Sequence, residues 1–254
     1  MALLSHKKIS CFLSVFFCTA LSATAHEPEA QTRFGHAHTH DAINKGMDVH
    51  FQTGIESRYS LEGRDSLDGD AISASSLDLG RGRFTGGLWY GWSPDQDYEE
   101  SRITLGLTEQ LGDFEFYASY TYLKFPESDD NEVGVGGVWS GLPLQLDVAL
   151  DAYYSFDADG AFWELSLSRA VEVSEGLTFT GAGMFGVNDG YVSDGHSGAN
   201  HLGLRLGSEY SLSEALTITG HATYSWALNR NSRLAGDEQL ADFFHGGLGL
   251  EWAF

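Results

Sequence analysis

The sequence predicts an all-β protein, a single antiparallel, up-and-down transmembrane β-barrel of about twelve strands. Three observations lead to this fold class. Apolar and polar residues alternate with a period of two along most of the chain, the connections between these runs are short and long in turn, and the aromatic residues gather near the ends of the runs. A period of two gives each strand two different faces, one for lipid and one for the interior.

Residues 1–25 are typical of a cleaved secretory signal peptide. Lys7 and Lys8 supply its positive region, residues 9–21 its apolar core, and small residues precede a cleavage site before His26. We therefore expect export from the cytoplasm and a final location in the bacterial outer membrane.

Composition excludes several classes of function for the mature chain. Both cysteines, Cys11 and Cys18, lie in the signal segment, so the mature protein has no disulfide. Without the two signal-peptide lysines, 12 basic residues face 36 acidic ones, a formal charge of −24. Such a charge repels phosphate backbones, so no nucleic-acid partner is expected.

Residues 26–46 are polar and without hydrophobic period, which predicts a flexible periplasmic arm. Imidazoles at alternate positions can chelate a transition metal, so His36, His38 and His40 are candidate metal ligands. The alternative is a solvated polar leader, since short His tracts are a compositional signal only.

From residue 47 to residue 254 the alternation predicts the barrel. The clearest run, residues 144–156, alternates for thirteen residues, which is long for a globular strand and suits a tilted membrane-spanning one. The twelve expected strands are 47–60, 71–79, 83–92, 101–109, 114–124, 131–139, 144–156, 161–170, 177–186, 200–210, 216–226 and 243–254.

The connections support this division independently. Every second one is short, and the others are longer and acidic, with residues 157–160 as the one short exception. Short periplasmic turns opposite long external loops are typical of outer-membrane barrels. Both chain ends then fall on the short-turn, periplasmic side.

Aromatic residues on the outward register form two bands, as expected where a barrel meets the two interfaces of a bilayer. The band near the long loops is expected to contain Tyr59, Tyr90, Trp92, Tyr120, Tyr122, Tyr154, Phe156, Trp163, Phe185, Tyr224, Trp226 and Phe244.

The last strand ends on an aromatic residue with no tail beyond it. Trp252 and Phe254 lie on its apolar row, and a terminal Phe on an amphipathic strand resembles the signal by which outer-membrane barrels are recognised for assembly. We therefore expect the barrel-assembly machinery to be a partner.

Several strand-and-turn motifs resemble the TorF-type porin family. They are Ser57-Arg58-Tyr59 followed by Gly63, the segment Phe84-Thr85-Gly86-Gly87-Leu88-Trp89, and the segment Leu111-Gly112-Asp113-Phe114-Glu115-Phe116-Tyr117. The resemblance covers the first half of the barrel, and Leu61-Glu62-Gly63 departs from the family's apolar or aromatic Arg-Gly continuation. It implies a porin.

The expected register turns an excess of acidic side chains inward. The expected lumen-lining acids are Glu56, Asp78, Glu115, Glu132, Asp147, Asp151, Glu164, Glu209 and Glu251, and the expected lumen-lining bases are Arg58, Arg102 and Arg205. Nine acids against three arginines favour a porin-like channel for passive passage of small cationic or neutral solutes. The alternative is a closed structural or surface-recognition barrel, filled by Arg–carboxylate pairs and acting through its acidic external loops.

An enzyme is not expected. Barrel lipases need a His and a Ser two residues apart on one strand face, and no strand here contains that pair. His201, His221 and His245 face inward, but the first and last are expected near the outer rim and His221 near the middle, as polar lining.

No cofactor is expected beyond loosely bound divalent cations at the acidic loops, where carboxylates could bridge to lipopolysaccharide. Outer-membrane lipid and lipopolysaccharide are thus the expected surroundings. A merely soluble acidic surface explains the same loops, and nothing in the sequence specifies an oligomeric state.

Overall fold

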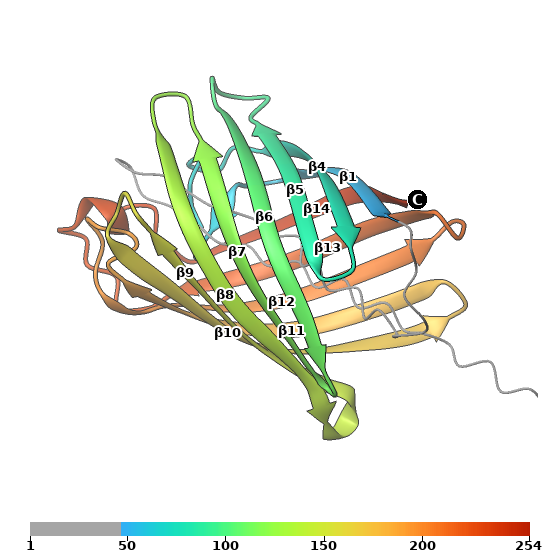
Figure 1. Ribbon diagram of the computed structural model, residues 1–254. Coiled ribbons are helices and arrows are strands. Elements are labelled where there is room, and N and C mark those ends of the chain that lie inside the picture. The colour runs from blue at the N-terminus through green and yellow to red at the C-terminus, as the bar shows by residue number, and fades with distance from the viewer. Residues whose placement is uncertain (1–46) are drawn as a thin grey trace, which may run out of the picture.

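The computed structural model describes residues 47–254, and these form a closed barrel of twelve antiparallel strands (Figure 1). Each strand pairs with its sequence neighbours, and β1 pairs with β14 to close the ring. The barrel strands are β1 Asp48–Glu56, β4 Ile72–Arg81, β5 Phe84–Trp92, β6 Glu99–Leu111, β7 Phe114–Lys124, β8 Asp129–Leu142, β9 Leu146–Ser155, β10 Gly160–Ser174, β11 Leu177–Asp189, β12 Gly198–Ser211, β13 Leu216–Ala227 and β14 Phe243–Ala253.

The predicted fold class is confirmed, and each expected strand has its counterpart. Several strands are longer than predicted, notably β6 and β8. β9 begins later than predicted because Pro143–Gln145 form a 3-10 turn, in which Leu144 takes a φ of 66° and leaves the extended conformation. No helix within residues 47–254 is long and apolar enough to span a membrane.

The seam between the first and last strands is closed by backbone hydrogen bonds that reach the final residue. Val49 accepts a hydrogen bond of 2.9 Å from the Phe254 amide, and the Phe51 and Trp252 rings lie 5.7 Å apart. Figure 1 shows the C-terminus beside the start of β1. Phe254 is thus the end of a paired strand, whereas its role in assembly stays a prediction.

The outer face of the barrel is apolar. Alternate residues of each strand are large hydrophobic side chains that lie exposed on the outside, for example Leu105, Leu204 and Leu248. Their strand neighbours face inward, because successive side chains point to opposite faces of a sheet, and most are smaller or polar; Leu123, Phe162 and Met184 are large apolar exceptions. An apolar outer face and a polar interior are the arrangement of a barrel whose surroundings are lipid.

Two features of the first strand differ from the prediction. β1 ends at Glu56 rather than continuing to residue 60, because the chain turns away into a loop. Tyr59, predicted in the outward aromatic band, is completely buried. Its inward position allows its hydroxyl to donate a hydrogen bond to Glu100, which an outward ring could not do.

The connections alternate as predicted between short turns and longer loops. Gly82, Gly112 and Gly176 take positive φ values in three of the short turns, where a side chain would be strained. The long loops include a small hairpin of β2 (Ser60–Leu61) and β3 (Arg64–Asp65), and a short helix η2 (Ala235–Asp237). The predicted signal peptide and His-rich arm lie outside the described residues.

Candidate functional site: the barrel interior

The interior has two different ends. Near the short turns, five inward carboxylates lie on five strands and are all partly exposed: Asp78, Glu115, Asp147, Glu209 and Glu251. We call this ring of acids the acidic vestibule. Of the nearby inward side chains, His50 lies 3.7 Å from Glu251, as an ion pair when its ring is protonated.

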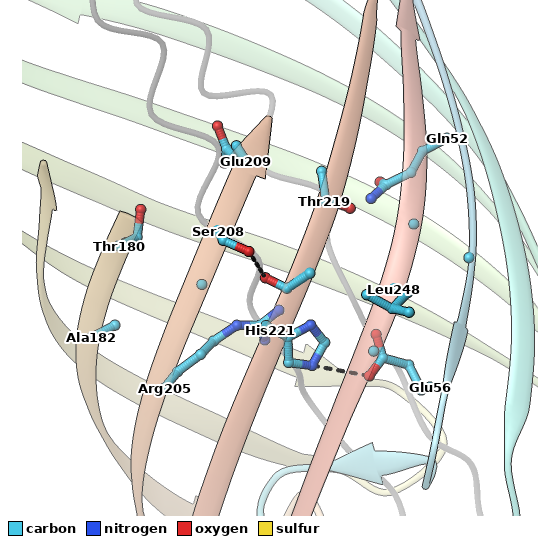
Figure 2. A pocket seen from close by; sticks show the side chains of 15 residues that line it. Gln52, Glu56, Thr180, Ala182, Arg205, Ser208, Glu209, Thr219, His221 and Leu248 are labelled. Atoms are coloured by element: carbon cyan, nitrogen blue, oxygen red, sulfur yellow. Dashed lines mark hydrogen bonds and ion pairs between the residues drawn. The ribbon is translucent and has the colours of Figure 1, made fainter. Parts of the chain in front are cut away.

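A pocket continues from the vestibule into the barrel wall. Its cavity volume is about 70 Å³, it opens to solvent, and mostly small or polar residues of β1 and β11–β14 line it. Figure 2 shows Arg205 extending from β12 toward His221 on β13, with Glu209 on the same strand as Arg205. Water and small polar solutes can therefore occupy this part of the interior.

The long-loop end is packed instead. The β2–β3 hairpin, with its flanking residues 59 to 67, folds into the barrel, and we call it the plug hairpin. Tyr59, Leu61, Glu62 and Arg64 have no exposed surface, and Leu67 has little. Tyr59 and Leu61 pack with Leu67 and Ile72 in one apolar cluster.

The plug hairpin crosses the whole interior. Tyr59 contacts Glu100 on β6, and a Cβ on Gly63 would lie 2.5 Å from His201 Cβ on β12. β6 and β12 are six places apart in a ring of twelve strands, so they stand on opposite sides. Gly63 has a φ of 73°, and its missing side chain lets the hairpin tip meet the His201 ring.

Buried polar contacts fasten the plug hairpin to a second loop. The Arg64 guanidinium donates to the Gly236 carbonyl at 2.8 Å and to Asn200 at 2.9 Å, and it lies 3.4 Å from Asp237. Arg64 and Asp237 are both completely buried. A buried charge pair needs such additional hydrogen bonds to offset its loss of hydration.

Asp237 is held in its charged form by several donors. Burial by itself raises the pKa of Asp237, but hydrogen bonds from the Asn231 and His196 amides and from the His196 ring bring that pKa below its ordinary value. The carboxylate thus stays available to Arg64 at neutral pH.

A second polar cluster fixes the base of the hairpin to β6. The Arg102 guanidinium donates to the Tyr59 hydroxyl at 2.7 Å, forms an ion pair with Glu100, and lies 4.4 Å from the centre of the Trp89 ring. Two strands away on β8, Glu132 accepts a hydrogen bond from the Tyr191 hydroxyl. Burial disfavours the charged phenolate and raises the pKa of Tyr191 well above its ordinary value, so the hydroxyl keeps its proton and stays a donor.

The predicted lining residues therefore divide between the two ends. Glu115, Asp147, Glu209, Glu251 and Arg205 are partly exposed, whereas Arg102, Glu132, Asp151 and Glu164 are buried in the interior. Arg58 differs from the prediction, because the strand ends before it. Its side chain pairs with Asp65 beside the hairpin.

Sequence reasoning missed the plug. Glu62, Arg64 and Asp237 lie in segments that were predicted to be external loops, and no periodicity marks them as buried. Glu100 and Asp130 were also placed in loops, but β6 and β8 extend far enough to turn them inward. One signal was present, because Leu61, Leu67 and Leu240 are apolar residues within otherwise polar loops.

The inward histidines are closer together than predicted. His221 and His245 were expected at different heights, yet their rings are 5.7 Å apart, and Glu56 lies beside both. His201 lies separately, 3.5 Å from Glu164. The predicted ligands His36, His38 and His40 lie outside the described residues, so their metal binding stays a prediction.

Comparison with known proteins supports the fold. No family model and no curated protein matches the chain, so the TorF-type resemblance stays a prediction. Among solved structures, the KdgM porin aligns with a TM-score of 0.55 at 8% identity, over 82% of this chain and 99% of the other. The NanC porin aligns with a TM-score of 0.50 at 11% identity, over 82% of this chain and 99% of the other.

The COG4313 outer-membrane channel from Pseudomonas putida F1 gives a TM-score of 0.51 at 12% identity, over 85% of this chain and 98% of the other. The chain thus has the fold of bacterial outer-membrane porins and channels. At such low identity the likeness extends to architecture, and the solute must be argued from the side chains of this barrel.

Proposed function

We propose that this protein is a narrow outer-membrane channel for passive passage of small cationic or neutral solutes, and that it is not an enzyme. The acidic vestibule carries the proposal. Five carboxylates around one mouth raise the local concentration of cations and repel anions, because low-dielectric walls concentrate the field in a cleft. The porin-like fold supports passage as the role of such an interior.

The negative charge of the vestibule distinguishes this barrel from one of its structural neighbours. The KdgM porin has been solved in complex with oligogalacturonate, which is a chain of acidic sugars. An acidic vestibule repels such a ligand, so the solute proposed here has the opposite or no charge. The plug hairpin narrows the other end, which favours small solutes.

Reversal potentials in planar bilayers test the proposal. Under a salt gradient the mature protein should favour cations, and the preference should fade as salt shortens the Debye length from about 30 Å at 0.01 M to about 3 Å at 1 M. Asp147→Asn combined with Glu209→Gln should weaken it. Glu109→Gln is the matched control, because that carboxylate is exposed on the outer register of β6. An unchanged preference in the double variant would reject the vestibule as its source.

The closed barrel remains the second candidate, and the buried plug hairpin favours it. It requires that the wild type carry no current at any salt concentration. The acidic external loops would then act by recognition at the surface.

We further propose outer-membrane lipid and lipopolysaccharide as the surroundings and the barrel-assembly machinery as the partner that inserts the chain. The apolar outer face and the paired aromatic C-terminus support both. Exposed loop acids such as Asp95 and Glu127 suit loosely bound divalent cations that bridge to anionic lipid.

A further inference from the structure

Glu56, His221 and His245 converge on one point inside the barrel, from the three adjacent strands β1, β13 and β14. His221 Nε2 lies 3.0 Å and His245 Nδ1 lies 3.9 Å from Glu56 Oε2. Each residue contributes one ligand atom, and all three atoms lie within 4.8 Å of one another. Figure 2 shows Glu56 and His221 pointing toward each other.

The register explains how residues from separate strands meet. Gly247 on β14 is the direct partner of Glu56 on β1 and of His221 on β13, so it stands between them. A Cβ on Gly247 would lie 2.3 Å from Glu56 Oε1. The missing side chain therefore leaves the space in which the carboxylate reaches the imidazole. His245 is the next inward residue on β14 and completes the triangle.

The three ligand atoms are poorly satisfied by the rest of the protein. Glu56 Oε2, His221 Nε2 and His245 Nδ1 are buried and, apart from their contacts with one another, have no hydrogen-bond partner among the described residues 47–254. His245 is only 1% exposed. Buried polar atoms that the rest of the protein leaves unsatisfied are costly, so two imidazole nitrogens and one carboxylate oxygen aimed at one point indicate a missing ligand.

We infer that Glu56, His221 and His245 bind a divalent transition-metal ion such as Zn²⁺, Cu²⁺ or Ni²⁺. Two imidazoles and one carboxylate suit these ions, whereas Ca²⁺ and Mg²⁺ prefer oxygen ligands throughout. Tetrahedral Zn²⁺ with bonds of about 2.0–2.1 Å needs ligand atoms about 3.3 Å apart, which lies between the present separations of 3.0 Å and 3.9 Å from Glu56 Oε2.

The site is open on one side. Glu56 and His221 line the solvent-connected pocket, and the Glu56 side chain is 31% exposed. A fourth coordination position would face this pocket and take water or a solute group. Arg205 on β12 extends toward His221 (Figure 2), and its positive charge opposes a bound cation. It therefore weakens the site and makes binding reversible. The inference stands whether or not the barrel conducts.

Metal titration of the mature protein in detergent tests the site. Tag-free protein with His26, His36, His38 and His40 changed to Ala removes the imidazoles of the arm as competing ligands. Calorimetry with Zn²⁺ should give one ion per chain. Glu56→Gln and His221→Gln should each weaken binding by at least about tenfold, since even second-shell changes cost 10–100-fold. Arg205→Gln should tighten it.

His50→Gln is the matched control, because His50 also lies inward beside a carboxylate but belongs to no group of three candidate ligands within residues 47–254. It should leave the affinity unchanged. The Cu²⁺ form of the unaltered barrel should show two coupled nitrogens by electron paramagnetic resonance, which needs no variant to fold. Three results would each overturn the inference. The protein with an intact cluster could bind no metal, the Glu56→Gln and His221→Gln variants could bind it as tightly as that protein does, or the copper spectrum could lack two coupled nitrogens. None of these readouts depends on current, so they fail separately from the channel proposal.

Discussion

The plug hairpin makes a quantitative prediction about access through the barrel. Replacing Arg64 with Met removes the guanidinium while keeping most of the side-chain length. The lost contacts are the hydrogen bonds of 2.8 Å to Gly236 and 2.9 Å to Asn200, together with the charge pair to Asp237. A hydrogen bond to a charged group contributes about 1.5–3 kcal/mol, so the two bonds together contribute about 3–6 kcal/mol.

That range agrees with the cost of about 3–5 kcal/mol for removing one partner of a buried ion pair. Every 1.4 kcal/mol is about tenfold in an equilibrium constant, so the packed state should lose at least about a hundredfold in population relative to the open one. Arg64 lies outside the twelve barrel strands, and of these three partners only Asn200 belongs to one (β12), so the loss should fall mainly on the plug hairpin.

Single-channel recording checks this directly. Arg64→Met should show larger or more frequent open states than the wild type, and faster hydrogen exchange at residues 59–67. Arg230→Met is the control, because Arg230 also bonds loop carbonyls but its side chain lies near the surface. On a detergent gel, a boiled sample that migrates more slowly than the unheated sample would show that each variant folds. If Arg64→Met kept the wild-type current and exchange rates, the reasoning from the buried contacts would be refuted.

Two further predictions rest on the fold, and two concern the segments before residue 47. Leu204→Lys on the apolar outer face should cost about 2–4 kcal/mol of insertion free energy and reduce the heat-modifiable band, whereas Thr180→Lys in the interior pocket should be milder; equal tolerance would mean that the register is wrong. Folding lowers the pKa of Asp237. The charged Asp237 therefore stabilises the folded loops fully when the pH is above the ordinary aspartate pKa of about 3.9, and this stabilisation is lost as the pH falls through the lower pKa of the folded state. Channel opening should therefore rise in acid, Asp237→Asn should be open already at neutral pH, and the exposed neighbour variant Glu238→Gln should respond like the wild type. Finally, the intact mass of the exported protein should correspond to a chain that begins at His26, and a peptide of residues 26–46 should bind Zn²⁺ or Cu²⁺ more tightly than its His36, His38 and His40 to Ala variant; a retained leader or identical titrations would contradict these two predictions.

The barrel itself could be predicted from the sequence because its rule is local. A strand between lipid and an aqueous interior must alternate at every second residue, so residues such as Leu204 and Arg205 reveal their faces without knowledge of their neighbours. Strand order followed from loop lengths, since antiparallel neighbours need only short turns. The inward direction of Asp147, Glu209 and Glu251 followed from the same parity.

Only the tertiary structure decided what fills the interior. Arg64 and Asp237 are 173 residues apart, and their burial depends on a loop that folds back across the ring. No local pattern encodes such a contact. The Glu56, His221 and His245 cluster likewise depends on the registers of β1, β13 and β14, which place Gly247 between two ligands. Parity specifies the face of the sheet, whereas register and loop packing specify which inward groups meet, and both are set by contacts distant in sequence.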